Sequence, residues 1–139
     1  MPFIASIEPV YRLPDGLTLR LHRGDEVLFT STKHWLHPLF DLEPLLAEGL
    51  DPAGTVLADR ITGLAAAHLV ARMGIRHLRT QVLSRLAIPV LERHGIDTRC
   101  SRQVARIQCA TESLLLDVAD AGSAYALLRA RRDQALAGR

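Results

Sequence analysis

The sequence predicts an α/β protein in which a mixed β-sheet, with an antiparallel hairpin at its edge, lies between helices as a three-layer sandwich. Residues 17–31 alternate apolar and polar side chains around a turn, as the strands of a hairpin do. From residue 34 onward, segments with helical spacing alternate with short apolar runs. Parallel strands joined by helices, together with one hairpin, give this architecture.

The hairpin is the first element. Leu17, Leu19 and Leu21 alternate with polar residues, Arg23-Gly24-Asp25 turns the chain, and residues 26–30 form the second strand. Because alternate side chains of a strand share a face, we expect the leucines to be buried.

A helix is predicted over residues 34–48, where leucines recur at helical spacing. It ends at Gly49, a residue suited to a left-handed cap. Pro38 fits a first turn, whereas Pro44 lies further inside. We therefore expect a kink or two shorter helices.

The next strand is predicted over residues 55–58, a short apolar run bounded by turn signals. Asp59 follows it directly. A helix is predicted from Ile61 to Met73, with Gly74 as its stop. This helix is apolar on almost every side, so we expect it to be covered on most sides.

A further strand and helix follow. The strand is predicted over residues 76–83, and Ser84 is the expected N-cap of a helix that reaches His94 and stops at Gly95. Pro89 lies inside this helix and removes one backbone hydrogen bond. A late start or a local bend is therefore expected.

The last predicted strand covers residues 98–107, and the tail is predicted to be helical over 111–136, with a break near residues 120–122. Residues 1–16 contain three prolines and do not have a helical pattern. We expect an N-terminal extension over 1–16 and a single α/β domain over 17–139.

Composition fits one soluble globular domain: 139 residues, 48% hydrophobic, 23% charged and a formal net charge of +2. The sequence predicts neither a signal peptide nor a membrane anchor. Two cysteines without zinc-site spacing favour reduced thiols and a cytoplasmic protein. Arginines are frequent in the second half, but they fall on several elements that need not share a face, so nucleic-acid binding is not expected.

Three segments resemble a known family. They are Ala58-Asp59-Arg60-Ile61-Thr62-Gly63, Leu91-Glu92-Arg93-His94-Gly95-Ile96, and Cys109-Ala110-Thr111-Glu112 with the apolar run after it. In this order they are similar to segments of the domain of unknown function 1893, a family of small prokaryotic proteins, over roughly residues 17–130. The resemblance implies a cytidine-deaminase-like fold. Two positions depart from the family pattern: Leu64 stands where a lysine is usual, and Ala110-Thr111 stands where Pro-Met is usual.

The residues that zinc deaminases need are absent from the sequence. Those enzymes hold zinc with a His or Cys that is followed two places later by Glu, and with a Cys-x-x-Cys pair. None of the six histidines is followed in this way, and the chain has no Cys-x-x-Cys. We therefore expect no metal, no cofactor and no zinc-dependent deamination.

A ligand cleft is expected at the carboxyl ends of the parallel strands, where helices begin. Free backbone N–H groups and the helix dipole favour an anion or a polar ring there. The candidate ligand-binding residues are Asp59, Thr62, Gly63 and Ser84. The alternatives are structural: Asp59 and Ser84 are helix N-caps, and Gly63 is a packing contact.

Cys109 and Glu112 are the second candidate group, at the same cleft. If a helix begins at Cys109, its dipole favours the thiolate form, and Glu112 lies on the same side one turn later. The two residues are then candidates for catalysis or ligand binding. In the alternative, Glu112 caps the helix and Cys109 is a small buried side chain.

The histidines suggest no metal site. His34 and His37 have a spacing that could hold a metal ion, but no third ligand is near in sequence, and a solvated pair is expected. Trp35 between them is a candidate anchor for an interface or a ligand. His68 lies on the most apolar helix and is expected to be a buried, neutral histidine.

Three functional hypotheses follow. The first is a deaminase-fold protein without zinc that binds a small polar or anionic ligand, nucleotide-like ligands included. The second is an interaction module that docks on a partner, or self-associates as a homo-oligomer, through a sheet edge or exposed apolar surface. The third is an enzyme that depends on Cys109. No membrane partner is expected, and the sequence alone does not establish a reaction.

Overall fold

A computed structural model describes residues 6–107 and 126–133. At its centre is a five-stranded sheet with the order β2-β1-β3-β4-β5. The strands β1 (Leu19–Arg23) and β2 (Glu26–Ser31) form an antiparallel hairpin, and β1 is also antiparallel to β3 (Val56–Thr62). The strands β4 (His77–Ser84) and β5 (Asp97–Val104) continue the sheet in parallel with β3. The predicted α/β class and the mixed sheet with an antiparallel edge hairpin are confirmed.

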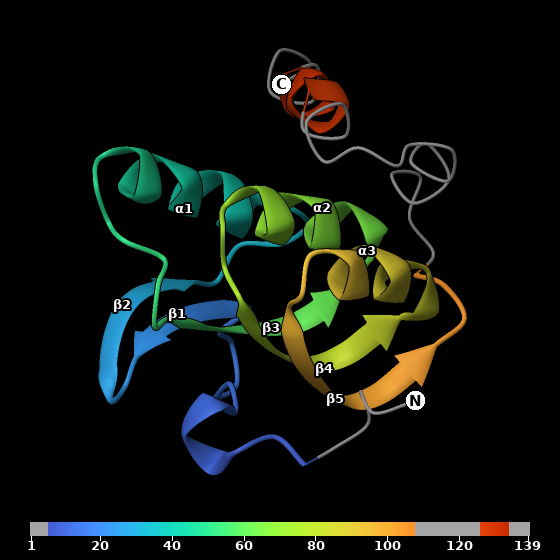
Figure 1. Cartoon of the computed structure of the whole chain (residues 1–139), viewed down its shortest axis with the longest axis horizontal. Coiled ribbons are helices and arrows are strands. Elements are labelled where there is room, and N and C mark those ends of the chain that lie inside the picture. Colours follow the sequence, from blue (N-terminus) through green and yellow to red (C-terminus); the bar gives the residue numbers. More distant parts are fainter. Residues whose placement is uncertain (1–5, 108–125, 134–139) are drawn as a thin grey trace.

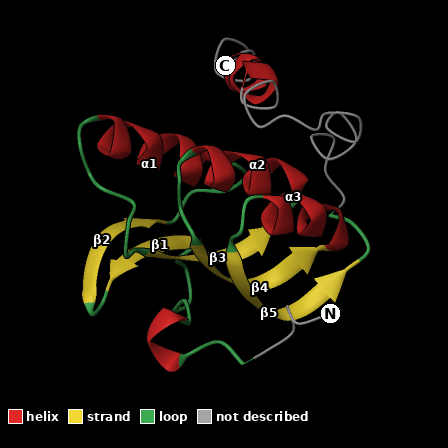
Figure 2. Ribbon diagram, in the orientation of Figure 1, coloured by secondary structure: helices red, strands yellow, loops and turns green. Residues whose placement is uncertain are grey.

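Helices cover one face of this sheet (Figure 1; Figure 2). They are α1 (His37–Ala47), α2 (Leu64–Arg72) and α3 (Ile88–Arg93). Because β3, β4 and β5 follow one another in the same direction across the sheet, right-handed crossovers place α2 and α3 on the same side. The other face carries the N-terminal segment with the short 3-10 helix η1 (Pro9–Tyr11). The helices α1, α2 and α3 thus form one layer on one face of the sheet. Within the described residues, the opposite face carries only the short η1 and not the second helical layer of the predicted three-layer sandwich.

The hydrophobic core lies between the sheet and the helices. Every residue of α2 from Leu64 to Ala71 is buried, including His68, as its apolar sequence predicts. The leucine face of β1 is buried as well. Residues 126–133 are helical, and Leu128 is buried in the same core. The helical tail predicted over 111–136 is confirmed for this part and otherwise lies outside the described residues.

The helix α1 begins later than predicted. Its first residue is His37 because Trp35 has a left-handed backbone, with φ of 58°, which a helix cannot include. Pro44 lies inside α1, but residues 37–47 form one helix rather than two shorter ones. Gly49 follows the helix with φ of 116°, as the expected left-handed stop.

The strand β3 is longer than predicted, and the helix after it starts later. The sequence predicts a strand over 55–58 and a helix from Ile61, whereas β3 extends to Thr62 and α2 begins at Leu64. Ile61 and Thr62 pair with Val82 and Leu83 of β4. Pairing with the neighbouring strand therefore overrides the local helical pattern.

The segment after β4 agrees better with the prediction. Ser84 caps the 3-10 helix η2 (Arg85–Ala87) and accepts a hydrogen bond from the backbone N of Leu86 at 3.3 Å. The helix α3 starts late, with Pro89 in its first turn, as expected. The strand β5 ends at Val104, earlier than the predicted residue 107. None of the helices in the described part of the chain has the length and apolar character that crossing a bilayer requires.

Candidate functional site

In β3, the regular alternation of side chains between the two faces of the sheet is interrupted between Asp59 and Thr62. Side chains three positions apart on a regular strand point to opposite faces. Here Thr62 hydrogen-bonds Asp59 and both are buried, so the two side chains lie on the same face. Ile61, which a regular strand would place beside Asp59, is instead 50% exposed. On β4, the partners of Asp59 and Thr62 are Thr80 and Leu83. On β5, the next residues in register are Cys100 and Gln103, whose side chains are hydrogen-bonded to each other.

Asp59 stands at the end of a chain of hydrogen bonds. Oγ1 of Thr62 lies 2.9 Å from Oδ2 of Asp59 and 3.0 Å from Oγ1 of Thr80, which is also 3.1 Å from the carbonyl oxygen of Val82. The chain has three contacts, but the two threonine hydroxyls supply only two protons. If Asp59 is protonated, it donates to Thr62, Thr62 donates to Thr80, and Thr80 donates to Val82. If Asp59 is ionised, Thr62 donates to the carboxylate instead, so the chain of hydroxyls can serve either form of the Asp59 carboxyl group.

Burial favours the neutral form of this carboxyl group. Asp59 is only 9% exposed, and burial raises the pKa of its carboxyl group to about 7. The hydroxyl of Thr62, the backbone N–H groups of Arg60 and Ile61, and the charge of Arg60 oppose this rise. A carboxyl group that titrates near neutral pH can either donate or accept a hydrogen bond with a ligand, and such groups are concentrated at functional sites.

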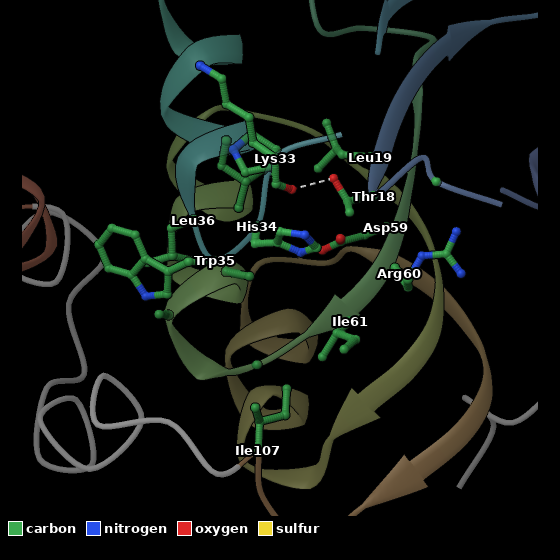
Figure 3. Close-up of a pocket in the computed structure, with 16 residues that line it drawn as sticks. Thr18, Leu19, Lys33, His34, Trp35, Leu36, Asp59, Arg60, Ile61 and Ile107 are labelled. Atoms are coloured by element: carbon green, nitrogen blue, oxygen red, sulfur yellow. Dashed lines mark hydrogen bonds between the residues drawn. The ribbon is translucent and has the colours of Figure 1, made fainter. Parts of the chain in front are cut away.

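A cavity of about 540 Å³ adjoins Asp59. It lies between the loop that connects β2 to α1, the end of β3 and the start of α2 (Figure 3). Its volume is in the range of small-molecule sites. Figure 3 shows the ring of His34 directed toward Asp59, with Trp35 beside it on the same loop. Most of the remaining wall is apolar: Leu19, Leu36, Leu39, Ile61, Ala65, Ala66 and Ile107.

The loop over the cavity is held in place by several contacts. The hydroxyl of Thr18 donates to the carbonyl oxygen of Lys33 at 2.6 Å, and the backbone N–H of Lys33 donates to Oγ of Ser31 at 3.1 Å. The Trp35 ring packs edge-on against His37, with 5.2 Å between ring centroids. Because Trp35 also adopts a left-handed backbone, the loop carries local strain of a kind that is found at binding sites.

The two neighbouring histidines do not form a metal site. His34 is directed into the cavity, whereas His37 contacts the Trp35 ring. Within residues 6–107 and 126–133, no three His, Cys, Asp or Glu side chains are grouped so that they could hold a metal ion.

Comparison with known proteins identifies the family. The model of the family described as Domain of unknown function (DUF1893) matches residues 14–131. The chain belongs to the DUF1893 family. Its fold is similar to the crystal structure of a DUF1893 family protein from Thermotoga maritima, with a TM-score of 0.74 and 20% identity, over 83% of this chain and 80% of that chain. No curated protein matches the chain.

The structure brings together three of the residues that the sequence singled out in this DUF1893 protein. Asp59 and Gly63 line the cavity, and Thr62 hydrogen-bonds Asp59. The alternative in which Asp59 is a helix N-cap is wrong, since Asp59 lies inside β3 and Gly63 occupies the N-cap of α2. Ser84 is a cap, the structural alternative for this residue. Cys109 and Glu112 lie outside the described residues.

The loop between β2 and α1 contributes a wall of the DUF1893 cavity. Trp35, the candidate anchor for an interface or a ligand, lines it, and so do three residues that the sequence did not indicate for this cavity: Thr18, Lys33 and His34. Spacing along the chain could not show that this loop reaches β3, because its path depends on the left-handed Trp35 and on the contact from Thr18.

Proposed function

We propose that this DUF1893 protein binds a small molecule with a planar, polar ring, such as a nucleobase or a nucleotide, in the cavity beside Asp59. The observation that carries the proposal is a buried carboxyl group on the wall of a mostly apolar cavity. Burial of such a group costs free energy. A ligand that forms hydrogen bonds with Asp59 would offset part of this cost, and the ring nitrogens of a nucleobase offer both donors and acceptors.

The loop supplies groups that complement such a ligand. Trp35 is 37% exposed at the cavity and offers an aromatic face on which a planar ring can stack. Lys33 and His34 lie on the same wall; the ammonium group of Lys33 pairs with Asp41 at 2.7 Å, and the ring of His34 can donate a hydrogen bond to a polar substituent. Gly63 lies at the start of α2, where the helix dipole would favour the same substituent.

A cytidine-deaminase-like fold without zinc belongs to the same proposal. The mixed sheet with an antiparallel edge hairpin supports this assignment. The three-layer part of the assignment receives no support from α1, α2 and α3, which share one face. A ligand-binding role in the cleft does not require a second helical layer, because the cavity lies between the sheet, α1 and α2.

The experiment is a ligand titration followed by fluorescence. Trp35 is the only tryptophan, so its emission reports on the cavity. Nucleobases, nucleosides, nucleotides and phosphorylated sugars are added in turn, and the melting temperature is measured in parallel. At least one base-containing ligand should change the emission and raise the melting temperature. No effect from any of them would reject the proposal.

Variants localise the binding. Asp59→Asn should weaken ligand binding by about tenfold or more, since the hydrogen bond between the ligand and the carboxyl group is lost or altered. Asp25→Asn is the matched control, because Asp25 is an exposed aspartate in the hairpin turn. Equal weakening by both variants would show that net charge, not the cavity, determines binding.

Self-association is a second candidate function. Ile61, 50% exposed, and Trp35, 37% exposed, both lie at the cavity and would be covered by a second copy of the chain. Light scattering over a range of protein concentrations measures the mass. A dimer that Ile61→Glu dissociates, together with no response to the ligands above, would favour this candidate.

A further inference from the structure

A second cavity lies on the other face of the sheet, under the N-terminal segment. Figure 1 shows this segment, with η1 in blue, on the side of the sheet opposite α1, α2 and α3. The cavity measures about 730 Å³ and its wall includes Ser6, Tyr11, Arg12, Asp59, Gln81 and Ser101. The ligand proposed above for the first cavity makes no use of it.

Arginines from the sheet hold the N-terminal segment in place. Nη2 of Arg20 donates to the carbonyl oxygens of Val10 and Arg12, each at 3.1 Å. Nε of Arg60 donates to the carbonyl oxygen of Leu17 at 3.0 Å. Since these bonds tie the middle and the C-terminal end of the segment to the sheet, the wall of the cavity is preformed rather than assembled by a ligand.

The charges on this face do not balance. Glu8 pairs with Arg79 at 3.0 Å and with Arg99 at 3.2 Å, and Asp97 pairs with Arg79 at 3.3 Å. In contrast, Arg12, Arg20 and Arg60 donate to carbonyl, amide or imidazole acceptors, which carry no negative charge. Within the described part of the chain, none of these three guanidinium groups forms an ion pair with a carboxylate, although the charge of Arg60 acts on the nearby Asp59. Such an excess of positive charge attracts anions.

The polar groups on the wall are suited to an oxyanion. Nε of Arg12 donates to the carbonyl oxygen of Ile7 at 3.2 Å, which positions the guanidinium and leaves its two Nη groups for a ligand. Oε1 of Gln81 accepts from Arg60 at 2.9 Å, so the amide nitrogen is the part of Gln81 left to donate. The hydroxyl of Ser101 adds a third donor to the same cavity.

We propose that this cavity is a second binding site, which takes a phosphate group, either free or as the monoester of a small metabolite, on Arg12, Gln81 and Ser101. A phosphate offers several acceptor oxygens to these donors, and the Nη groups of Arg12 can bind two of them at once. Its second negative charge also offsets more of the unpaired positive charge than a carboxylate would. The two cavities share Asp59 as a wall residue, but Arg12, Gln81 and Ser101 line only the second one.

Calorimetric titration of the full chain tests the proposal, with inorganic phosphate, glycerol phosphate and acetate as probes. Phosphate or its monoester should bind more tightly than acetate. Binding of inorganic phosphate alone identifies the free ion as the ligand, and binding of the monoester identifies a phosphorylated metabolite. No binding of either at millimolar concentration, or equal binding of acetate, would overturn the proposal.

Variants show where the phosphate binds. Arg12→Gln should weaken binding by at least about tenfold, and Arg12→Lys should restore part of the loss. Ser101→Ala, at an exposed position of β5, should weaken binding by about threefold without disturbing the fold. Arg23→Gln is the matched control, since Arg23 is bonded to the carbonyl oxygen of Asp51 at 2.7 Å, away from this cavity.

His34→Ala separates the two cavities, because His34 lines only the first one. Phosphate binding that is unchanged in His34→Ala and lost in Arg12→Gln supports the second site. Phosphate binding that His34→Ala abolishes would place the ion in the first cavity and overturn this proposal. An equal loss in Arg12→Gln and Arg23→Gln would also overturn it, since only overall charge would then matter.

Discussion

Oδ2 of Asp59 and Oγ1 of Thr62 lie 2.9 Å apart in the protein interior, although both belong to β3 and are three positions apart. This contact exists because the strand changes its facing between the two residues. The same change exposes Ile61 and gives the first cavity its polar wall. The irregularity of β3 therefore places the Asp59 carboxyl group at the wall of the cavity.

Asp59→Asn should stabilise the protein most strongly above neutral pH. Burial raises the pKa of Asp59 to about 7 in the folded protein, whereas the unfolded chain titrates near 3.8. Below the lower value the carboxyl group is neutral in both states. As the pH rises from there to about 7, the unfolded chain has already released its proton, so the contribution of Asp59 to stability falls. Asparagine does not ionise, and its amide N–H can replace the acid proton toward Thr62.

Denaturant unfolding at several pH values measures this effect. The free energy of unfolding of Asp59→Asn relative to the natural protein should increase between about pH 4 and pH 8 by on the order of 1 to 4 kcal/mol. Asp25→Asn, in the exposed hairpin turn, should show no such trend. A difference that decreases with pH would show that the folded protein favours the ionised form of Asp59 and that burial does not control its titration.

Thr62→Val should move the midpoint of the same pH profile to higher pH. The Thr62 hydroxyl lowers the pKa of Asp59, so its removal should raise that pKa further. The variant should also lose about 1 to 3 kcal/mol of stability, because the buried polar groups of Asp59 and Thr80 lose their hydrogen-bond partner. Thr98→Val is the control: Thr98 is buried and bonds the carbonyl oxygen of Ile96 at 3.2 Å, outside the chain. It should lose stability but leave the midpoint of the profile unchanged; equal midpoints for both variants would contradict the link between Thr62 and Asp59.

The parts of the fold that are encoded locally could be predicted from the sequence. Alternation of leucines in β1 identifies the hairpin because a strand with one buried face must alternate. Gly49 and Gly74 mark the ends of α1 and α2 because the chain there needs a left-handed residue, with φ of 116° and 81°. The resemblance to the DUF1893 family needed only the order of short segments, and the family model confirms it.

The parts that depend on contacts across the fold could not be predicted. Ile61 and Thr62 have a helical pattern with the alanines that follow, yet they pair with β4. The sequence predicts Asp59 at a helix start, whereas Asp59 lines a cavity from inside β3, so its burial comes from the strand. Arg20 and Arg60 hold carbonyl groups of the N-terminal segment, a role that leaves no periodicity in the sequence.

Arg60→Gln should loosen the N-terminal segment. Besides its bond to Leu17, Arg60 donates to the carbonyl oxygen of Pro14 at 3.0 Å and to Gln81 at 2.9 Å. Without these bonds the segment opens more often, and trypsin should cut after Arg12 severalfold faster under native conditions. Arg23→Gln, which changes an arginine outside the segment, should leave the rate unaltered. A cleavage rate equal to that of the natural protein would show that Arg60 does not hold the segment.

Cys100 should resist alkylation in the folded protein. It is fully buried, and burial raises the pKa of its thiol, although a hydrogen bond with Gln103 partly offsets the rise. Since the thiolate is the reactive form, iodoacetamide near neutral pH should reach Cys100 only after unfolding. The hypothesis of a reactive Cys109 then predicts rapid uptake of one label, detected by mass spectrometry and absent from Cys109→Ser. A label that persists in Cys109→Ser would contradict the burial of Cys100, and slow labelling of Cys109 would remove the Cys109-dependent enzyme from consideration.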